Sequence, residues 1–162
     1  MTLTHLDRRG RAHMVDVADK PVTVRTAIAR GSIQMSGEAF DLVAGNSGPK
    51  GDVLSTAEIA GTVGAKRTAE LIPLCHPIGL DHVSVSATLD PKLPGVAVEA
   101  EVKAVGRTGV EMEALTAVTV SLLTVYDMVK SVGHRMRISD IELIEKRGGT
   151  RGDWSINDGA DE

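Results

Sequence analysis

Charged side chains that could do chemistry are set into an apolar segment in the second half of the chain. Residues 109–130, GVEMEALTAVTVSLLTVYDMVK, carry Glu111, Glu113, Asp127 and Lys130 among aliphatic residues that cover most of a helix circumference. Burying an unpaired carboxylate or ammonium costs several kcal/mol, so these groups must be exposed or held in paired, hydrogen-bonded sites. Charges on such a helix indicate a cavity or an interface.

The spacing of these charges places them at the two opposite ends of the predicted helix. Glu113 and Asp127 share one polar stripe, about 80° wide at about 100° per residue. They are 14 residues apart, which is roughly 21 Å along a helix axis. One small substrate cannot easily touch both. Either the two ends serve different sites, or a two-fold symmetry mate brings its opposite end to each site. We favour the second and expect active sites shared between chains.

Two loops add candidate residues. In LIPLCHP, residues 71–77, prolines flank Cys75 and His76 and present them rigidly, as a substrate-contacting loop requires. A crossover from helix to strand with a half-buried Cys and a surface His explains these residues equally well.

Lys50 lies in a constrained turn before a helix N-terminus, where an ammonium and backbone N–H groups suit a phosphate. A solvated turn lysine is the commoner reading of that residue alone.

Asp127 and Lys130 have the i, i+3 spacing that lets a carboxylate touch an ammonium. A surface ion pair alone would mean little, but this pair lies at the end of the polar stripe, which raises its interest.

Glu111 and Glu113 lie about 200° apart on a regular helix, and no two histidines have ligand spacing, so we expect no metal site. Phosphate-loop and dinucleotide fingerprints are also missing. A nucleotide would therefore be held by scattered lysines and arginines.

Size and composition limit the class of protein. A chain of 162 residues suits one domain. Aromatic content of 2% and a net charge of -4 argue against a nucleic-acid partner. Cys75 is the only cysteine, so no intramolecular disulfide forms, and a reducing compartment, the cytoplasm, is expected. We find no signal peptide or membrane-spanning run.

Periodicity predicts the order of elements. We expect a strand over 22–33, a short helix over 37–44 capped by Ser36, a helix from Asp52 to 65 with a short piece over 66–71, a hairpin of 83–89 with 96–102, a long helix after Gly109 and a strand over 137–144. This is an α+β ferredoxin-like (split βαβ) plait, an antiparallel sheet with helices packed on one face. We expect a flexible arm over 1–14, one catalytic domain over 15–154 and a disordered acidic tail over 155–162.

Several motifs together resemble the molybdenum cofactor biosynthesis protein C family, the cyclic pyranopterin monophosphate synthases. They are LIPLCHP at 71–77, KGDV at 50–53, AKRT at 65–68, TGVEMEALTA at 108–117, YDMVK at 126–130, HMVDV at 13–17 and the tail from Gly148-Gly149 to Gly152-Asp153. The likeness extends from about His5 to Trp154.

The resemblance implies a phosphorus–oxygen lyase of molybdopterin synthesis. Such enzymes convert (8S)-3',8-cyclo-7,8-dihydroguanosine 5'-triphosphate, a cyclised GTP, into cyclic pyranopterin monophosphate and pyrophosphate. They are homohexamers, trimers of dimers, with sites at the dimer interface. We expect no resident cofactor, and Mg²⁺ assistance to the triphosphate stays open.

By the same resemblance, Asp127 takes the family's active-site aspartate position, and Lys50 and Lys130 match lysines of the catalytic pocket. The substrate-binding segments match Leu74, Cys75, His76, Met112 and Glu113. Other pocket positions match Arg25, Lys66 and Glu111. The role of Cys75 stays open between a substrate contact and a small buried hydrophobe.

The chemistry of these residues fits such a reaction. Lysines with lowered pKa values could transfer the protons that ring rearrangement needs, and the ammoniums of Lys50 and Lys130 would lower each other's pKa. We hypothesise that these lysines act as acid and base, with Asp127 orienting Lys130. Positive charge for the departing pyrophosphate could come from Arg25, Lys66 and Arg67.

Two other functions compete with the synthase. One is a non-catalytic nucleotide or pterin sensor on the same plait, since this fold carries sensors and nucleic-acid readers as well as enzymes. It leaves the placement of Lys50, Asp127 and Lys130 unexplained. The other is a metal-dependent phosphohydrolase, which lacks ligands in this sequence.

Overall fold

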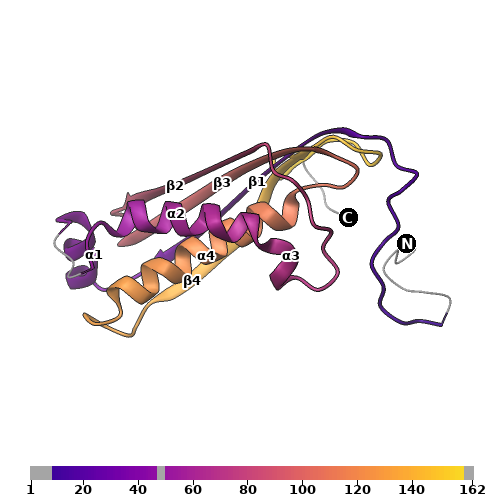
Figure 1. The fold of residues 1–162 in the computed structure, drawn as a ribbon. Helices are drawn as coiled ribbons and strands as arrows, with labels where there is room; N and C mark the ends of the chain where they lie inside the picture. Colours follow the sequence, from indigo (N-terminus) through magenta and orange to yellow (C-terminus); the bar gives the residue numbers. More distant parts are fainter. Residues whose placement is uncertain (1–8, 47–49, 159–162) are drawn as a thin grey trace.

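A computed structural model describes residues 9–46 and 50–158 of the chain, and Figure 1 shows its two layers. The elements are β1 (Thr23–Gln34), α1 (Gly37–Ala44), α2 (Val53–Lys66), α3 (Thr68–Leu71), β2 (His82–Asp90), β3 (Gly95–Gly106), α4 (Glu111–Val129), β4 (Arg137–Arg147) and β5 (Trp154–Ser155). The sheet order is β2-β3-β1-β4-β5 with antiparallel neighbours. The predicted ferredoxin-like plait is confirmed, with β5 added at one edge.

Alternation along β1 decides which face of the sheet is covered. Ala27, Ala29 and Ile33 are fully buried, whereas Val24 and Arg30 on the opposite face are exposed. The buried face of β1 packs against α4, and α2 covers β2 beside α4, so both helices lie on one face of the sheet (Figure 1). The core is aliphatic, as the scarcity of aromatic residues requires.

Helix α4 is the core helix of the domain. Val118, Leu122 and Val125 are fully buried on it. Its length and apolar composition alone would also fit a membrane span, but here it packs against the sheet and, on another side, against α2. Two of its residues at the N-terminal end, Glu111 and Glu113, place negative charge beside the positive end of the helix dipole.

Helices α2 and α4 approach closely because glycine stands at the contact. A Cβ on Gly61 would lie 2.2 Å from Ser121 Oγ and 2.9 Å from the carbonyl oxygen of Ala117. The Ser121 hydroxyl donates to the carbonyl oxygen of Ala57 at 2.8 Å. The two helices are antiparallel, so the start of α2 lies beside the end of α4.

The caps that the sequence predicts are confirmed. Ser36 Oγ accepts from the N–H of Ala39 at the start of α1, and Asp52 Oδ1 accepts from the N–H of Ser55 at the start of α2. The helical piece expected over 66–71 is split differently, because α2 ends at Lys66 and α3 begins at Thr68. The Thr68 hydroxyl donates to the carbonyl oxygen of Ala65 across this break.

The C-terminal region departs from the sequence expectation in its strands. β4 continues to Arg147, three residues beyond the predicted strand, and β5 pairs with it through Lys146 and Trp154. The N–H of Ile156 donates to the carbonyl oxygen of Ile144. Parts of the predicted arm (1–8) and tail (159–162) lie outside the described residues, as do 47–49 of the turn before Lys50, and the domain bounds stay a prediction.

Candidate active site

Three charged residues meet at the C-terminal end of α4. Lys50 Nζ lies 2.8 Å from Asp127 Oδ2 and 3.1 Å from the Asp127 carbonyl oxygen. Lys130 Nζ lies 2.7 Å from Asp127 Oδ1. One carboxylate is therefore shared between two ammonium groups, and the predicted contact of Asp127 with Lys130 is confirmed. We call Lys50, Asp127 and Lys130 the lysine cluster.

The protonation states of the lysine cluster follow from these contacts. Hydrogen bonds from Lys130 and then from Lys50, with the charges of both lysines, lower the pKa of Asp127 to about 2. The hydrogen bond and charge of Asp127 raise the pKa of Lys130. The expectation that the pKa of Lys130 is lowered is thus wrong for the single chain, because Lys130 contacts the Asp127 carboxylate directly. Lys130 is charged at neutral pH.

A pocket of about 310 Å³ lies at the other end of α4. We call it the basic pocket. It is lined by the segment before β1, the start of β1, the loop after α3, the loop between β3 and α4, the start of α4, the end of β4 and the turn after β4. Its residues are Val15, Val17, Lys20, Arg25, Leu74, Cys75, His76, Arg107, Thr108, Gly109, Glu111, Met112, Lys146, Gly148, Gly149, Thr150 and Arg151.

Cations dominate the lining of the basic pocket. The sequence predicts Arg25 there but misses four further cations, which are Lys20, Arg107, Lys146 and Arg151. Glu111 is the one carboxylate among the lining residues. The glycine-rich tail, with Lys146 before it and Arg151 within it, is the one signal in the sequence that could have found two of them. The balance of charge favours an anionic ligand such as a polyphosphate.

Cys75 and Glu113 form a pair beside the basic pocket. The Cys75 thiol donates to Glu113 Oε1 at 3.5 Å, and Glu113 is 3% exposed. Burial raises the pKa of Glu113. Burial first, and then the charge of Glu113, raise the pKa of Cys75 to about 11. The thiol is therefore neutral at physiological pH and offers a small polar contact rather than a nucleophile.

His76 ties the N-terminal segment across the basic pocket. Its Nε2 lies 2.7 Å from the carbonyl oxygen of Val15. Because a carbonyl oxygen only accepts, Nε2 carries the hydrogen and donates it. Val15 and Val17 line the pocket beside this bond, so the segment that the sequence places at the start of the ordered domain forms a wall of the pocket.

The predicted site residues thus fall into two groups at opposite ends of α4 (Figure 1). The helix has 19 residues and is about 28 Å long. Arg25, Leu74, Cys75, His76, Glu111 and Met112 line the basic pocket, with Glu113 against Cys75. Lys66 belongs to neither group and is exposed at the end of α2. A single chain does not bring the lysine cluster to the basic pocket.

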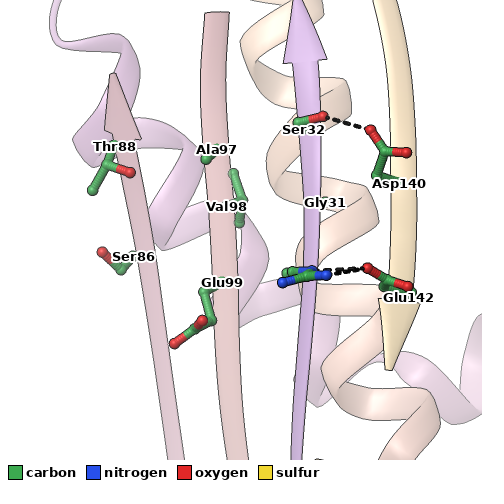
Figure 2. A pocket seen from close by; sticks show the side chains of 10 residues that line it. Gly31, Ser32, Ser86, Thr88, Ala97, Val98, Glu99, Asp140 and Glu142 are labelled. Carbon is green, nitrogen blue, oxygen red and sulfur yellow. Dashed lines mark hydrogen bonds and ion pairs between the residues drawn. The ribbon is translucent and has the colours of Figure 1, made fainter. Parts of the chain in front are cut away.

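A larger hollow of about 620 Å³ lies on the opposite, helix-free face of the sheet (Figure 2). Arg30 there pairs with Glu142 at 2.6 Å, and the Ser32 hydroxyl donates to Asp140. Glu99 also lines it. Carboxylates outnumber cations, so this hollow disfavours a triphosphate, and it holds no predicted site residue.

A search of residues 9–46 and 50–158 finds no group of three or more His, Cys, Asp or Glu side chains placed to hold a metal ion. The basic pocket instead offers guanidinium and ammonium groups. That the chain binds no metal stays a prediction.

These features define a ferredoxin-like α+β protein with cationic sites for an anionic small molecule. The model of the MoaC family matches residues 14–149. Two relatives named cyclic pyranopterin monophosphate synthase, from Cereibacter sphaeroides strains KD131 and ATCC 17029, are each 59% identical over 150 residues, 93% of this chain and 94% of the relative. The chain belongs to the MoaC family, as the sequence motifs predict.

The raised pKa of Cys75 can be measured directly, because alkylation of the only cysteine reports on that thiol alone. We expect the rate of reaction with iodoacetamide to rise with pH toward an inflection near 11. At pH 7.5 it should be at least about 100-fold slower than in the urea-unfolded chain. Circular dichroism at each pH checks that the fold persists. An inflection near the ordinary thiol pKa, about 8.5, would contradict the contact with Glu113.

Proposed function

We propose that the chain is a cyclic pyranopterin monophosphate synthase. It converts (8S)-3',8-cyclo-7,8-dihydroguanosine 5'-triphosphate into cyclic pyranopterin monophosphate and pyrophosphate, in the cytoplasm and without a resident cofactor. The observation that carries the proposal is that residues matching the family's motifs gather at the two ends of α4, one end rich in cations for the triphosphate and the other a Lys–Asp–Lys cluster for proton transfer.

The lysine cluster supplies the proton transfers. Asp127 holds Lys130 in its ammonium form, so Lys130 enters the reaction as a proton donor. Lys50 contacts the other carboxylate oxygen at 2.8 Å as an ammonium, so it must first lose a proton to act as the base. Asp127 keeps the two amino groups on either side of its carboxylate and stays ionised throughout, since its pKa is about 2.

The exposed side of the helix layer supports a site completed by a second copy. Ile59 and Val63 on α2 are 67% and 45% exposed, and Leu123 on α4 is 54% exposed. Large apolar side chains gathered on one face indicate a covered surface. On α4 this face includes Met112 of the basic pocket, then Leu123, then Lys130, because these residues lie within about 20° of one another around the helix.

A two-fold axis through the middle of this stripe explains how the two ends meet. The midpoint between Met112 and Lys130 falls at residue 121, so antiparallel packing of α4 on its copy places each Lys130 beside the partner's basic pocket. Leu123 then lies next to the axis. Lys66 follows Ile59 and Val63 on the exposed face of α2 and enters the site only in this arrangement. We propose that such dimers assemble further into a hexamer.

Lys130→Ala tests the catalytic proposal. Purified wild-type protein given the cyclised triphosphate should release pyrophosphate and cyclic pyranopterin monophosphate together, with and without a chelator. The variant should lose kcat by about 10²- to 10⁴-fold while substrate affinity changes little, because it removes a proton donor. Weakened affinity with normal kcat would reject this role for Lys130. Binding without conversion by wild-type protein would favour a sensor, and loss of turnover with a chelator would favour a metal-dependent phosphohydrolase.

Hybrid oligomers test the shared site. Lys130→Ala and His76→Ala damage opposite ends of α4, and each alone should be inactive. In a mixture that has exchanged subunits at equal ratio, half of the dimers are hybrids with one intact site each. Activity should therefore recover to about a quarter of the wild-type value. No recovery after mass spectrometry has proven exchange would mean that each site is built within one chain.

Leu123→Glu tests the surface itself. A carboxylate placed next to the two-fold axis meets its own copy, so the dimer should dissociate. Asn157→Glu adds the same charge at an exposed turn outside the helix layer and should leave the assembly unchanged. Sedimentation velocity distinguishes the two. If Leu123→Glu and Asn157→Glu had the same oligomeric state, the exposed face of α2 and α4 would not be the dimer interface.

A further inference from the structure

Lys50 keeps its place in the lysine cluster although its side chain is half exposed. Its Nζ donates to Asp127 Oδ2 at 2.8 Å and to the Asp127 carbonyl oxygen at 3.1 Å. A lysine side chain gives up much rotamer freedom when it is fixed, and an exposed ion pair by itself offsets little of that loss. The main chain at Lys50 must therefore be well placed for the amino group to stay on Asp127.

The second of these contacts joins the ends of two helices. The Asp127 carbonyl oxygen lies in the last turn of α4, where main-chain carbonyls lack a partner within the helix. The Lys50 ammonium gives this oxygen a donor and places positive charge at the negative end of the α4 dipole. Only Gly51 and Asp52 separate Lys50 from the start of α2 at Val53. The position of Lys50 is therefore tied to the first turn of α2.

Asp52 fixes that first turn with its side chain and its main chain. Its Oδ1 accepts from the N–H of Ser55 at 3.0 Å, and its Oδ2 accepts from the Ser55 hydroxyl at 2.7 Å. Its carbonyl oxygen accepts from the Thr56 hydroxyl at 2.6 Å. The hydrogen bond from the Ser55 hydroxyl, followed by the one from the Ser55 N–H, lowers the pKa of Asp52. The carboxylate is therefore ionised at neutral pH and keeps both acceptors.

Gly51 turns the chain from this cap toward Asp127. Its φ is +85°, in the left-handed region that favours glycine. A Cβ at Gly51 would meet nothing within 4 Å, so the backbone angle and not a close neighbour calls for glycine here. The angle at Gly51 sets the direction in which Lys50 leaves α2. We call Lys50, Gly51 and Asp52 the cap turn.

We propose that Asp52 is a positioning residue for proton transfer, because it caps α2 and thereby holds Lys50 against Asp127. The inference rests on the proposed synthase function and adds to it the residue that keeps Lys50 in the lysine cluster. Within the described part of the chain, the hydrogen bonds of Asp52 run to α2 and none runs to the lysine cluster. Asp52 thus acts through the main chain, and a neutral side chain that caps α2 should serve equally well.

Trace acetylation of the full chain with acetic anhydride at pH 8, followed by mass spectrometry of its peptides, measures how freely each lysine reacts. Lys92, exposed in the turn between β2 and β3, is the internal reference. In wild type, Lys50 should react more slowly than Lys92, because Asp127 holds it as an ammonium. Asp52→Ala should raise the rate at Lys50 by about two- to fivefold, since one lost N-cap frees the cap turn by up to about that factor.

The same variant should lower kcat by about two- to fivefold and leave KM within about twofold, because the cap turn lies far from the basic pocket. Asp52→Asn keeps an oxygen acceptor for the Ser55 N–H and should restore both the Lys50 rate and kcat. Ser36→Ala is the matched control. It removes the N-cap of α1, where Ser36 Oγ accepts from the N–H of Ala39, and it should leave both quantities at their wild-type values.

Gly51→Ala keeps the inference testable if Asp52→Ala fails to fold, and it should also raise the Lys50 rate, because alanine disfavours the backbone angle of the cap turn. Equal Lys50 rates in wild type, Asp52→Ala and Gly51→Ala would overturn the inference. So would a raised Lys50 rate with unchanged kcat, an Asp52→Asn variant as impaired as Asp52→Ala, or an equal effect of Ser36→Ala. If the Lys50 rates follow the expected order but wild type forms no cyclic pyranopterin monophosphate, Asp52 still positions Lys50 and the synthase proposal fails.

Discussion

The burial of α4 along most of its length constrains everything else in this protein. A helix covered by the sheet on one side and by α2 on another accepts charge only near its ends or on its one open face. Glu111 and Glu113 stand at the start, and Asp127 stands at the end. The two charged ends are held apart by the length of the helix, and no movement of a loop within one chain can close that distance.

This separation gives each end its own electrostatic character. At the end of α4 the ion pairs are local, since Asp127 bonds Lys130 one turn away and Lys50 from the start of α2. At the start of α4 the cations come from the segment before β1, from β1, from the loop after β3, from β4 and from the turn after β4, and fewer carboxylates than cations line this pocket. In the lysine cluster, Asp127 keeps Lys130 protonated. In the basic pocket, the excess of cations is available to neutralise a negatively charged ligand. Both are useful to a reaction that moves protons and expels a polyphosphate.

Local chemistry explains what could be predicted from the sequence. Ser36 and Asp52 cap helices because their side chains reach the N–H three residues on, and the hairpin follows from clean alternation of apolar residues. The contact of Asp127 with Lys130 follows from helical spacing. The basic pocket could not be predicted in full, because Lys20, Arg107 and Lys146 are far apart in the chain and meet only through tertiary folding. The pKa of Lys130 was predicted in the wrong direction, because the prediction considered the charge of Lys50 and not the Asp127 carboxylate that the same spacing places against Lys130.

The contact between Cys75 and Glu113 also bears on how the protein withstands oxidants. Peroxides attack the thiolate form of cysteine. With a pKa of about 11, only about one Cys75 thiol in ten thousand is ionised at pH 7. Burial of the thiol, reinforced by the charge of Glu113, therefore protects the one sulfhydryl of the chain from conversion to sulfenic acid. Burial and the contact with Glu113 hold the thiol in its neutral form beside the pocket, and the neutral form resists oxidation.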